Sequence, residues 1–275
     1  MRYALPGKVY LVGAGPGSAK LLTLQALEAL QEADLVLHDD LVSDDVLARI
    51  PARTAVLSVG KRCAQKKASQ EEIHRRMIGA ARSGKTVVRL KGGDPLIFGR
   101  TKDEILALRQ AGIAFEIIPG ITAASAAAAE AQIPLTERSS AEKLVFVSNH
   151  PSKEKVRRDW HTSVTQDATL VFYMPGSDFA ALTAELAARG LGERTPCLLV
   201  SNAARPDQKM IRTVLGELGS VPRVAAPSLL IVGSAVAEAR AEEWFAARRN
   251  AQEASTPETE ELSLGSQVTP NPVKK

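Results

Sequence analysis

The segment TVVRLKGGDP at residues 86–95 contains the pattern from which the fold can be predicted. Its first half is a run rich in branched side chains, which predicts a buried strand, and two glycines end that strand in a tight loop. Similar strand patterns occur at residues 9–12, 34–38, 55–59 and 115–118. Helical patterns separate them, and strands that alternate with helices indicate βα units in a mainly parallel sheet.

Three helices of the first half can be placed from capping residues and composition. Ser18 precedes leucines that recur at helical spacing, so it is predicted to cap a helix. Ser69 precedes Glu72 by three residues, which is the pattern of a capping box. An alanine-rich segment at residues 123–131 predicts a further helix after the strand at 115–118.

A polar stretch at residues 134–142 interrupts this alternation and predicts an interdomain boundary. Beyond it the alternation resumes, with strands expected at residues 144–148, 169–173, 197–200, 210–215 and 228–232 and a helix at 179–188. The C-terminal residues are rich in Glu, Ser, Thr and Pro, a composition that cannot build a core. We therefore expect an α/β protein with an N-terminal domain at residues 1–137, a C-terminal domain at 138–249 and a disordered tail at 250–275.

The composition of the 275 residues, with 45% hydrophobic and 24% charged side chains, is typical of a globular enzyme. Only 4% of the residues are aromatic, which favours helices packed on sheets over an all-β architecture. The net charge of +4 fits an anionic small molecule as well as nucleic acid. Since no nucleic-acid-binding motif is present, we expect no nucleic-acid partner.

Cysteine usage and hydropathy indicate where the protein works. Cys63 and Cys197 are far apart in the sequence, so a disulfide framework is not expected and a reducing cytoplasm is the natural setting. The N-terminal residues lack the apolar stretch of a signal peptide, and no apolar run reaches the roughly 18 residues that a membrane span needs. We therefore expect a cytoplasmic protein without a membrane partner.

The first glycine-rich loop admits two interpretations. Gly13, Gly15 and Gly17 lie between a strand and a helix, and Asp39 follows the next strand, which is close to a dinucleotide-binding fingerprint. Ser18, however, occupies the position of the third glycine of that fingerprint. A tight turn from strand to helix explains Gly13 and Gly15 equally well.

Two later loops extend the candidate site. Gly92-Gly93-Asp94-Pro95 and Pro119-Gly120-Ile121-Thr122 each follow a predicted strand. Because the carboxyl ends of parallel strands share one edge of a sheet, the three loops are expected to line one large pocket with exposed backbone donors and acceptors. Such a pocket suits a ligand with an adenine, a ribose and an amino-acid tail. The nucleotide-binding P-loop motif is absent, and the four histidines show no metal-ligand spacing, so no metal is expected.

At this point the chain resembles a known family, the uroporphyrinogen-III C-methyltransferases among the tetrapyrrole (precorrin) methylases. The resemblance covers about residues 7–240 and rests on these motifs: VGAGPG at 12–17, DLVS at 40–43, VGKR at 59–62, QEEI at 70–73, VVRLKGGDPLIFGR at 87–100, IPGIT at 118–122, IPLT at 133–136, TLVFYM at 169–174, RPDQ at 205–208 and LIVG at 230–233. It implies two α/β domains with the active site in the cleft between them, usually in a homodimer. It also implies S-adenosyl-L-methionine as cofactor, with S-adenosyl-L-homocysteine as product. The implied reaction converts uroporphyrinogen III, an anionic tetrapyrrole, to precorrin-2 by two successive methylations, for sirohaem or cobalamin biosynthesis.

The resemblance also assigns roles to individual residues. It makes Asp39 the candidate base and Lys61 a candidate proton donor, and it places Arg100, Asp103 and Arg138 at the substrate. Cofactor contacts are implied for Pro16, Gly92, Gly93, Asp94, Ile97, Thr122, Ala123, Met174 and Ala203. Each role has a plainer alternative: Asp39 could cap a loop, Lys61 could bind a substrate carboxylate, and an arginine is by default a surface residue.

The chain departs from the family pattern at two places. The usual FGRGGEE appears as FGRTKDE at residues 98–104, and the usual THR as TER at 136–138. Both departures lie beside residues implied in substrate binding. Another tetrapyrrole methylase of the same fold, and a homologue that binds cofactor or tetrapyrrole without catalysis, therefore stay open as alternatives.

Overall fold

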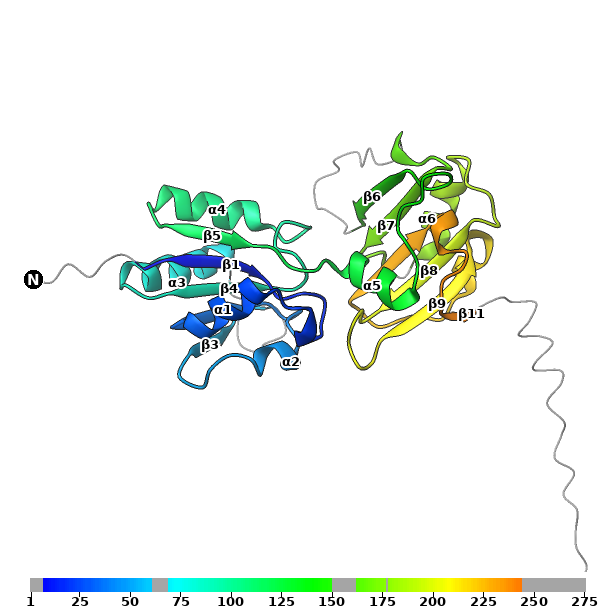
Figure 1. The fold of residues 1–275 in the computed structure, drawn as a ribbon. Helices are drawn as coiled ribbons and strands as arrows, with labels where there is room; N and C mark the ends of the chain where they lie inside the picture. Colours follow the sequence, from blue (N-terminus) through cyan, green and yellow to red (C-terminus); the bar gives the residue numbers. More distant parts are fainter. Residues whose placement is uncertain (1–6, 61–68, 150–161, 177, 244–275) are drawn as a thin grey trace, which may run out of the picture.

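The computed structural model describes residues 7–60, 69–149, 162–176 and 178–243, which form two lobes with one β-sheet each (Figure 1). Among these residues, no helix is both long enough and apolar enough to cross a bilayer. The predicted tail at residues 250–275 lies outside the described residues.

The first sheet is entirely parallel and has the strand order β3-β2-β4-β1-β5. Its strands confirm the five predicted from the sequence: β1 (Val9–Gly13), β2 (Leu35–His38), β3 (Ala55–Ser58), β4 (Val87–Lys91) and β5 (Phe115–Ile118). Apolar clusters pack on the sheet through alternate side chains of β1, with Val9 and Leu11 in one cluster and Val12 in the other. Because all strands point the same way, every loop after a strand lies at one edge of the sheet.

The helices of the first lobe are α1 (Leu24–Glu32), α2 (Asp44–Leu47), α3 (Gln70–Arg82) and α4 (Thr101–Gln110). Ser69 caps α3 as predicted, since its hydroxyl accepts a hydrogen bond from the Glu72 N–H at 3.1 Å. The prediction for Ser18 was wrong in extent, because Ser18 caps only the short 3-10 turn η1 (Ala19–Leu21). The α-helix begins later, at the cap Thr23, whose hydroxyl accepts from the Ala26 N–H.

The second sheet is mixed and has the strand order β11-β9-β8-β10-β7-β6. Its strands are β6 (Lys143–Ser148), β7 (Ala168–Tyr173), β8 (Pro196–Ser201), β9 (Lys209–Val214), β10 (Ser228–Val232) and β11 (Glu242–Glu243). Three neighbouring pairs, β7–β10, β8–β10 and β8–β9, are antiparallel, so the expectation of a mainly parallel sheet was wrong for this lobe. The reason lies in the connections, because parallel neighbours need a crossover, usually a helix. Between β6 and β11, α6 (Phe179–Ala187) is the one α-helix described. The segments that join β8, β9 and β10 contain only the 3-10 helix η3 (Leu215–Ser220).

The alanine-rich helix α5 (Ala123–Ala131) forms where predicted, and its packing bears on the domain boundary. Ala124, Ala127 and Ala131 belong to one apolar cluster with Val171 of β7 and Leu198 of β8. Figure 1 accordingly shows α5 against the second sheet. We therefore propose that the boundary lies at residues 119–122, ahead of α5, rather than at the predicted 137/138.

Candidate active site

The three glycine loops meet at the carboxyl edge of the first sheet. Gly15 and Gly93 exchange two backbone hydrogen bonds, of 3.2 Å from the Gly15 N–H and 2.7 Å from the Gly93 N–H. A Cβ added to Gly13 would stand 2.6 Å from the Gly120 nitrogen and 2.7 Å from the Gly93 carbonyl oxygen. The loops therefore approach so closely that a side chain at this contact would displace backbone atoms.

Asp94 fixes the geometry of two of these loops. Its Oδ1 accepts a hydrogen bond from the Leu96 N–H at 2.7 Å, and its Oδ2 accepts one from the Gly120 N–H at 3.0 Å. Gly93, beside it, has a φ of +69° and nothing within 4 Å of the place where a Cβ would stand. The carboxylate thus holds the loops together, and the Gly93 backbone is open to approach by a ligand.

Thr122 connects the last glycine loop to the second lobe. Its Oγ1 lies 2.5 Å from the Tyr173 hydroxyl oxygen, which also accepts a hydrogen bond from the Ala124 N–H at 3.3 Å. The Tyr173 ring contacts Phe98 of the first lobe and Phe146 of the second, with centroids 5.0 and 5.5 Å away. Burial raises the pKa of the Tyr173 phenol, although the hydrogen bond with Thr122 opposes this effect.

Replacing Tyr173 with phenylalanine is expected to lower the free energy of unfolding by about 1–3 kcal/mol near neutral pH, because it removes the hydroxyl that bonds to Thr122 and to the Ala124 N–H while keeping the ring. Since burial holds the folded-state pKa above the ordinary 10.0, folding opposes ionisation of the phenol. The wild type is therefore more stable than the phenylalanine variant by the full difference below pH 10, and this difference in stability declines as the pH rises above 10. Thermal unfolding of both proteins across this range measures the difference. If the difference in stability between the two proteins does not change with pH, folding does not raise the pKa of the Tyr173 phenol.

Arg205 of the second lobe reaches the first lobe beside the glycine loops. Its Nη2 donates to the Leu41 carbonyl oxygen at 2.5 Å, and its Nε lies 3.5 Å from the Pro16 carbonyl oxygen. A cavity of about 810 Å³ lies here between the lobes, but it is lined by none of the residues predicted to contact cofactor or substrate. It is lined from both lobes and from α5, by Gly17, Ser18, Lys20, Leu21, Asp40, Val42, Ser43, Asp44, Asp45, Glu130, Ala204, Arg205, Pro206, Asp207 and Gln208.

The sites predicted in the second lobe lie at one edge of its sheet. β7 and β8 both run antiparallel to β10, which lies between them, so their carboxyl ends share an edge. Met174 directly follows β7 and is exposed, with a φ of +52°. Ala203 follows β8 and is buried. Because Tyr173, at the end of β7, contacts Thr122 and Phe98, this edge meets the loop edge of the first sheet.

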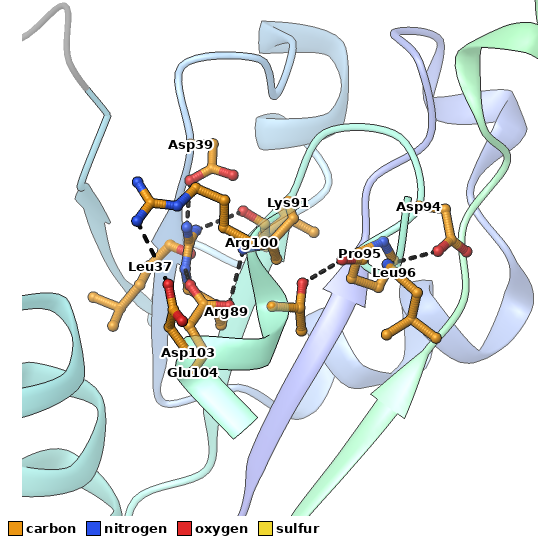
Figure 2. A network of polar contacts seen from close by, with 12 residues as sticks. Leu37, Asp39, Arg89, Lys91, Asp94, Pro95, Leu96, Arg100, Asp103 and Glu104 are labelled. Atoms are coloured by element: carbon orange, nitrogen blue, oxygen red, sulfur yellow. Dashed lines mark hydrogen bonds and ion pairs between the residues drawn. The ribbon is translucent and has the colours of Figure 1, made fainter. Parts of the chain in front are cut away.

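Four charged side chains form a largely buried cluster beside these loops, and sequence reasoning identified only one of them (Figure 2). Arg89 of β4 pairs with Asp39, the predicted base, and with Glu104 of α4. Glu104 also pairs with Lys91 at 2.9 Å. The available signal was a pair of cations at alternate positions of an otherwise apolar strand, since buried charges require partners.

The residues predicted to bind the substrate carboxylates occupy two separate places. Arg100 has a φ of +54°, is exposed and lies 3.5 Å from the carboxylate of Asp103. It lines a groove of about 500 Å³ whose apolar residues include Leu96 and Phe98. Arg138 is exposed in the turn that the bridge between residues 137 and 141 closes. The roles of all three charged residues stay predictions.

The remaining predicted site residues fall in three groups. Pro16 is buried, and its carbonyl oxygen lies 3.5 Å from Arg205 Nε. In the loop after β4, the half-buried residues are Gly92, Gly93, Asp94 and Ile97. Thr122 and Ala123 are half-buried at the start of α5. Lys61 lies outside the described residues. Within the described part of the chain, no group of three or more His, Cys, Asp or Glu is arranged to hold a metal ion.

Comparison with known proteins follows from this geometry. The family model of the tetrapyrrole (corrin/porphyrin) methylases matches residues 8–219. The chain belongs to this family. Siroheme synthase 1 from Klebsiella pneumoniae is 42% identical over 240 residues, which are 87% of this chain and 51% of the relative. The siroheme synthase of Zymomonas mobilis is 43% identical over 248 residues, 90% of this chain and 53% of the relative. This tetrapyrrole methylase thus spans about half the length of the curated relatives that it matches.

Solved structures show the same fold over nearly their whole length. Uroporphyrin-III C-methyltransferase from Thermus thermophilus, crystallised with S-adenosyl homocysteine, is 37% identical with a TM-score of 0.72. The match covers 84% of this chain and 94% of that one. A cobalt precorrin-4 methyltransferase, described as a cobalamin biosynthetic enzyme, is 30% identical with a TM-score of 0.76, covering 83% and 95%. The predicted tetrapyrrole methylase fold is therefore confirmed.

Proposed function

We propose that this tetrapyrrole methylase binds S-adenosyl-L-methionine and methylates two carbon atoms of uroporphyrinogen III in succession, which yields precorrin-2. The observation that carries the proposal is the contact of three glycine loops at the edge facing the second lobe, with the Gly93 backbone left open. Support for this acceptor comes from the uroporphyrin-III C-methyltransferase of Thermus thermophilus, to which 84% of this chain is similar.

The residues at this edge fit the proposed cofactor. The space beside the Gly93 Cα leaves room for a ribose or an amino-acid tail to lie against the loop, and Met174 and Ala203 extend the site from the second lobe. Asp94 holds the loops in place, since both of its carboxylate oxygens already accept backbone hydrogen bonds. When bound, S-adenosyl-L-methionine supplies an electrophilic methyl group to an electron-rich pyrrole carbon.

The chain itself contributes acid–base chemistry and positioning. Asp39 lies just after β2 with its side chain 31% exposed, so its carboxylate is accessible to take a proton from a pyrrole ring, which raises the nucleophilicity of the carbon. Arg100 presents a guanidinium group that can hold a substrate carboxylate with two hydrogen bonds. The cleft brings the reacting carbon and the methyl group to near-contact distance, which supplies much of the acceleration. Lys61 as proton donor, Arg138 as substrate ligand and the homodimer stay part of the proposal.

A second candidate acceptor is a later corrinoid precursor. The similarity to the cobalt precorrin-4 methyltransferase favours it, because its TM-score of 0.76 is higher than the 0.72 of the uroporphyrin-III enzyme. The departures at Thr101, Lys102 and Glu137, which flank the predicted substrate arginines, bear on the same question. Whether the product is used for sirohaem or cobalamin follows from the acceptor and from enzymes that act later.

The acceptor is tested by parallel assays with S-adenosyl-L-methionine and either uroporphyrinogen III or precorrin-2, in which kcat/KM is measured for each. We expect uroporphyrinogen III to be methylated with the higher kcat/KM. Methylation of precorrin-2 alone would overturn the proposed acceptor in favour of the second candidate. The Thermus thermophilus enzyme serves as positive control for the quality of the acceptor.

A further inference from the structure

The cluster of four charges places the guanidinium of Arg89 at its centre (Figure 2). The side chains of Arg89, Glu104 and Lys91 are only 3%, 1% and 4% exposed, whereas that of Asp39 is 31% exposed. Three of the charges are therefore inside the protein, and the fourth, the proposed base, lies where the cluster reaches the surface.

Every part of the Arg89 guanidinium has a fixed partner. Its Nε donates to Glu104 Oε1 at 2.8 Å, and its Nη1 donates to the carbonyl oxygens of Leu90 at 3.1 Å and Leu37 at 3.3 Å. Its Nη2 donates to Asp39 Oδ1. Because β4, the adjacent strand β2 and helix α4 all hold the group, its orientation toward Asp39 is determined by the fold.

The two cations and two anions balance one another inside the protein. Burial by itself would lower the pKa of Arg89, but the charges of Asp39 and Glu104 outweigh this effect and raise it. For Lys91, burial and the neighbouring charge of Arg89 lower the pKa, and the attraction of Glu104 only partly opposes them. Apolar side chains of similar size often stabilise a core at least as well as such a cluster, so stability alone does not explain these four residues.

We infer that Arg89 is a positioning residue for the reaction, which it serves by holding Asp39 Oδ1 in one place. Glu104 supports Arg89 in turn, because one of its carboxylate oxygens accepts from Arg89 Nε and orients the guanidinium, and the other accepts from Lys91. Because Arg89 holds Oδ1 and the Asp39 side chain is 31% exposed, Oδ2 is the oxygen that we assign to accept the substrate proton. The inference rests on the proposed function, since it takes Asp39 as the base.

A double-mutant cycle of Arg89→Gln and Asp39→Asn tests whether Arg89 acts through Asp39. Misplacement of a reacting group by about 1 Å can cost on the order of a hundredfold in rate, so Arg89→Gln is expected to lower kcat by about tenfold to a hundredfold. In the Asp39→Asn background, the same change is expected to have no further effect on kcat. If Arg89→Gln instead lowers kcat by the same factor in the wild-type and the Asp39→Asn backgrounds, the two residues act independently and the inference is overturned.

Folding is separated from positioning by two further readouts. Arg89→Gln leaves the buried carboxylates in excess, but the double variant restores the balance because Glu104 and Lys91 remain paired, so the double variant is expected to be at least as thermostable as Arg89→Gln. S-adenosyl-L-homocysteine affinity, measured by calorimetry, is expected to stay at the wild-type value in all variants. If Arg89→Gln does not fold, the cycle is run with Glu104→Gln, for which a smaller loss of kcat is expected and again none in the Asp39→Asn background.

Glu116→Gln is the matched control for Glu104→Gln. Glu116 also lies in the first lobe and pairs with Lys8 at 2.7 Å, but it comes from the interior of β5 and its side chain is 38% exposed. It is expected to leave kcat unchanged. Failure of the proposed function has a different signature: if Asp39→Asn keeps full turnover, Asp39 is not the base. If Asp39→Asn loses turnover but Arg89→Gln lowers kcat by the same factor in both backgrounds, only the role of Arg89 is overturned.

Discussion

Replacing Asp39 with asparagine is expected to lower kcat by about 10²–10⁴-fold, the usual contribution of a general base. The amide has nearly the size of the carboxylate and can still accept a hydrogen bond from Arg89, but it cannot take a proton from the substrate. S-adenosyl-L-homocysteine affinity is expected to stay unchanged, because the predicted cofactor contacts come from other loops. Initial rates of methyl transfer and calorimetric titration measure the two quantities.

Glu28→Gln is the control for this prediction. Glu28 is an exposed carboxylate of α1 in the same lobe, and it does not line the cavity between the lobes. Its variant is expected to keep wild-type kcat. Unchanged turnover of Asp39→Asn would exclude Asp39 as an essential base and leave it as a carboxylate that neutralises Arg89.

Gly120→Ala is expected to have the second largest effect, on folding and on cofactor binding together. The added Cβ would stand 2.3 Å from the Gly93 carbonyl oxygen and 2.8 Å from the Gly13 Cα, so backbone atoms must move. Overpacking of this kind costs about 1–3 kcal/mol and occasionally more. Because Asp94 bonds to the Gly120 N–H, the displacement is also expected to disturb the loop after β4 and to weaken S-adenosyl-L-homocysteine binding by at least about tenfold.

Gly79→Ala is the control in the same lobe, and it is expected to raise stability where Gly120→Ala lowers it. Gly79 lies in α3, and a Cβ there would have nothing within 4 Å. Alanine is better than glycine in a helix by up to about 1 kcal/mol, so this variant is expected to be slightly more stable. Thermal unfolding and calorimetry compare the two variants. Wild-type stability and affinity in Gly120→Ala would refute the tight contact of the three loops.

The first sheet and its loops could be predicted from the sequence because local patterns determine them. Apolar runs that end in glycine mark strands followed by tight turns, and their alternation with helices indicates a parallel order. The glycines at positions 13, 93 and 120 were predicted to share an edge, and in the structure their backbones are in contact. Only the reason for the glycines, the mutual approach of three loops, required the structure.

The second lobe was predicted less well. The five strands expected there, including the one at Lys209–Val214, form in the structure, whereas β11 (Glu242–Glu243) was not expected. The composition of a short apolar strand also does not determine its direction in the sheet. The polar residues after α5 resembled a linker, whereas the structure packs α5 itself on the second sheet. Small side chains such as those of Ala124 and Ala127 do not indicate in advance which sheet they will cover.

The charged cluster shows what local patterns miss at the candidate site. Asp39 was identified from its position after the strand at residues 34–38 and from the family resemblance, but its partner Arg89 was counted as part of the apolar-looking strand at residues 86–90. Glu104 lies in a segment of polar and charged residues at the start of α4, where an exposed side chain is the usual expectation. The pairing of the two joins residues 15 positions apart through the packing of α4 on β4, and no local spacing predicts it.

The most direct test of the proposed function is transfer of an isotopically labelled methyl group from S-adenosyl-L-methionine to uroporphyrinogen III by the purified protein. Mass spectrometry of the product is expected to show first one and then two labelled methyl groups, each bound to a ring carbon. Binding of both ligands without any gain of label would contradict the account and would leave a homologue that binds without catalysis.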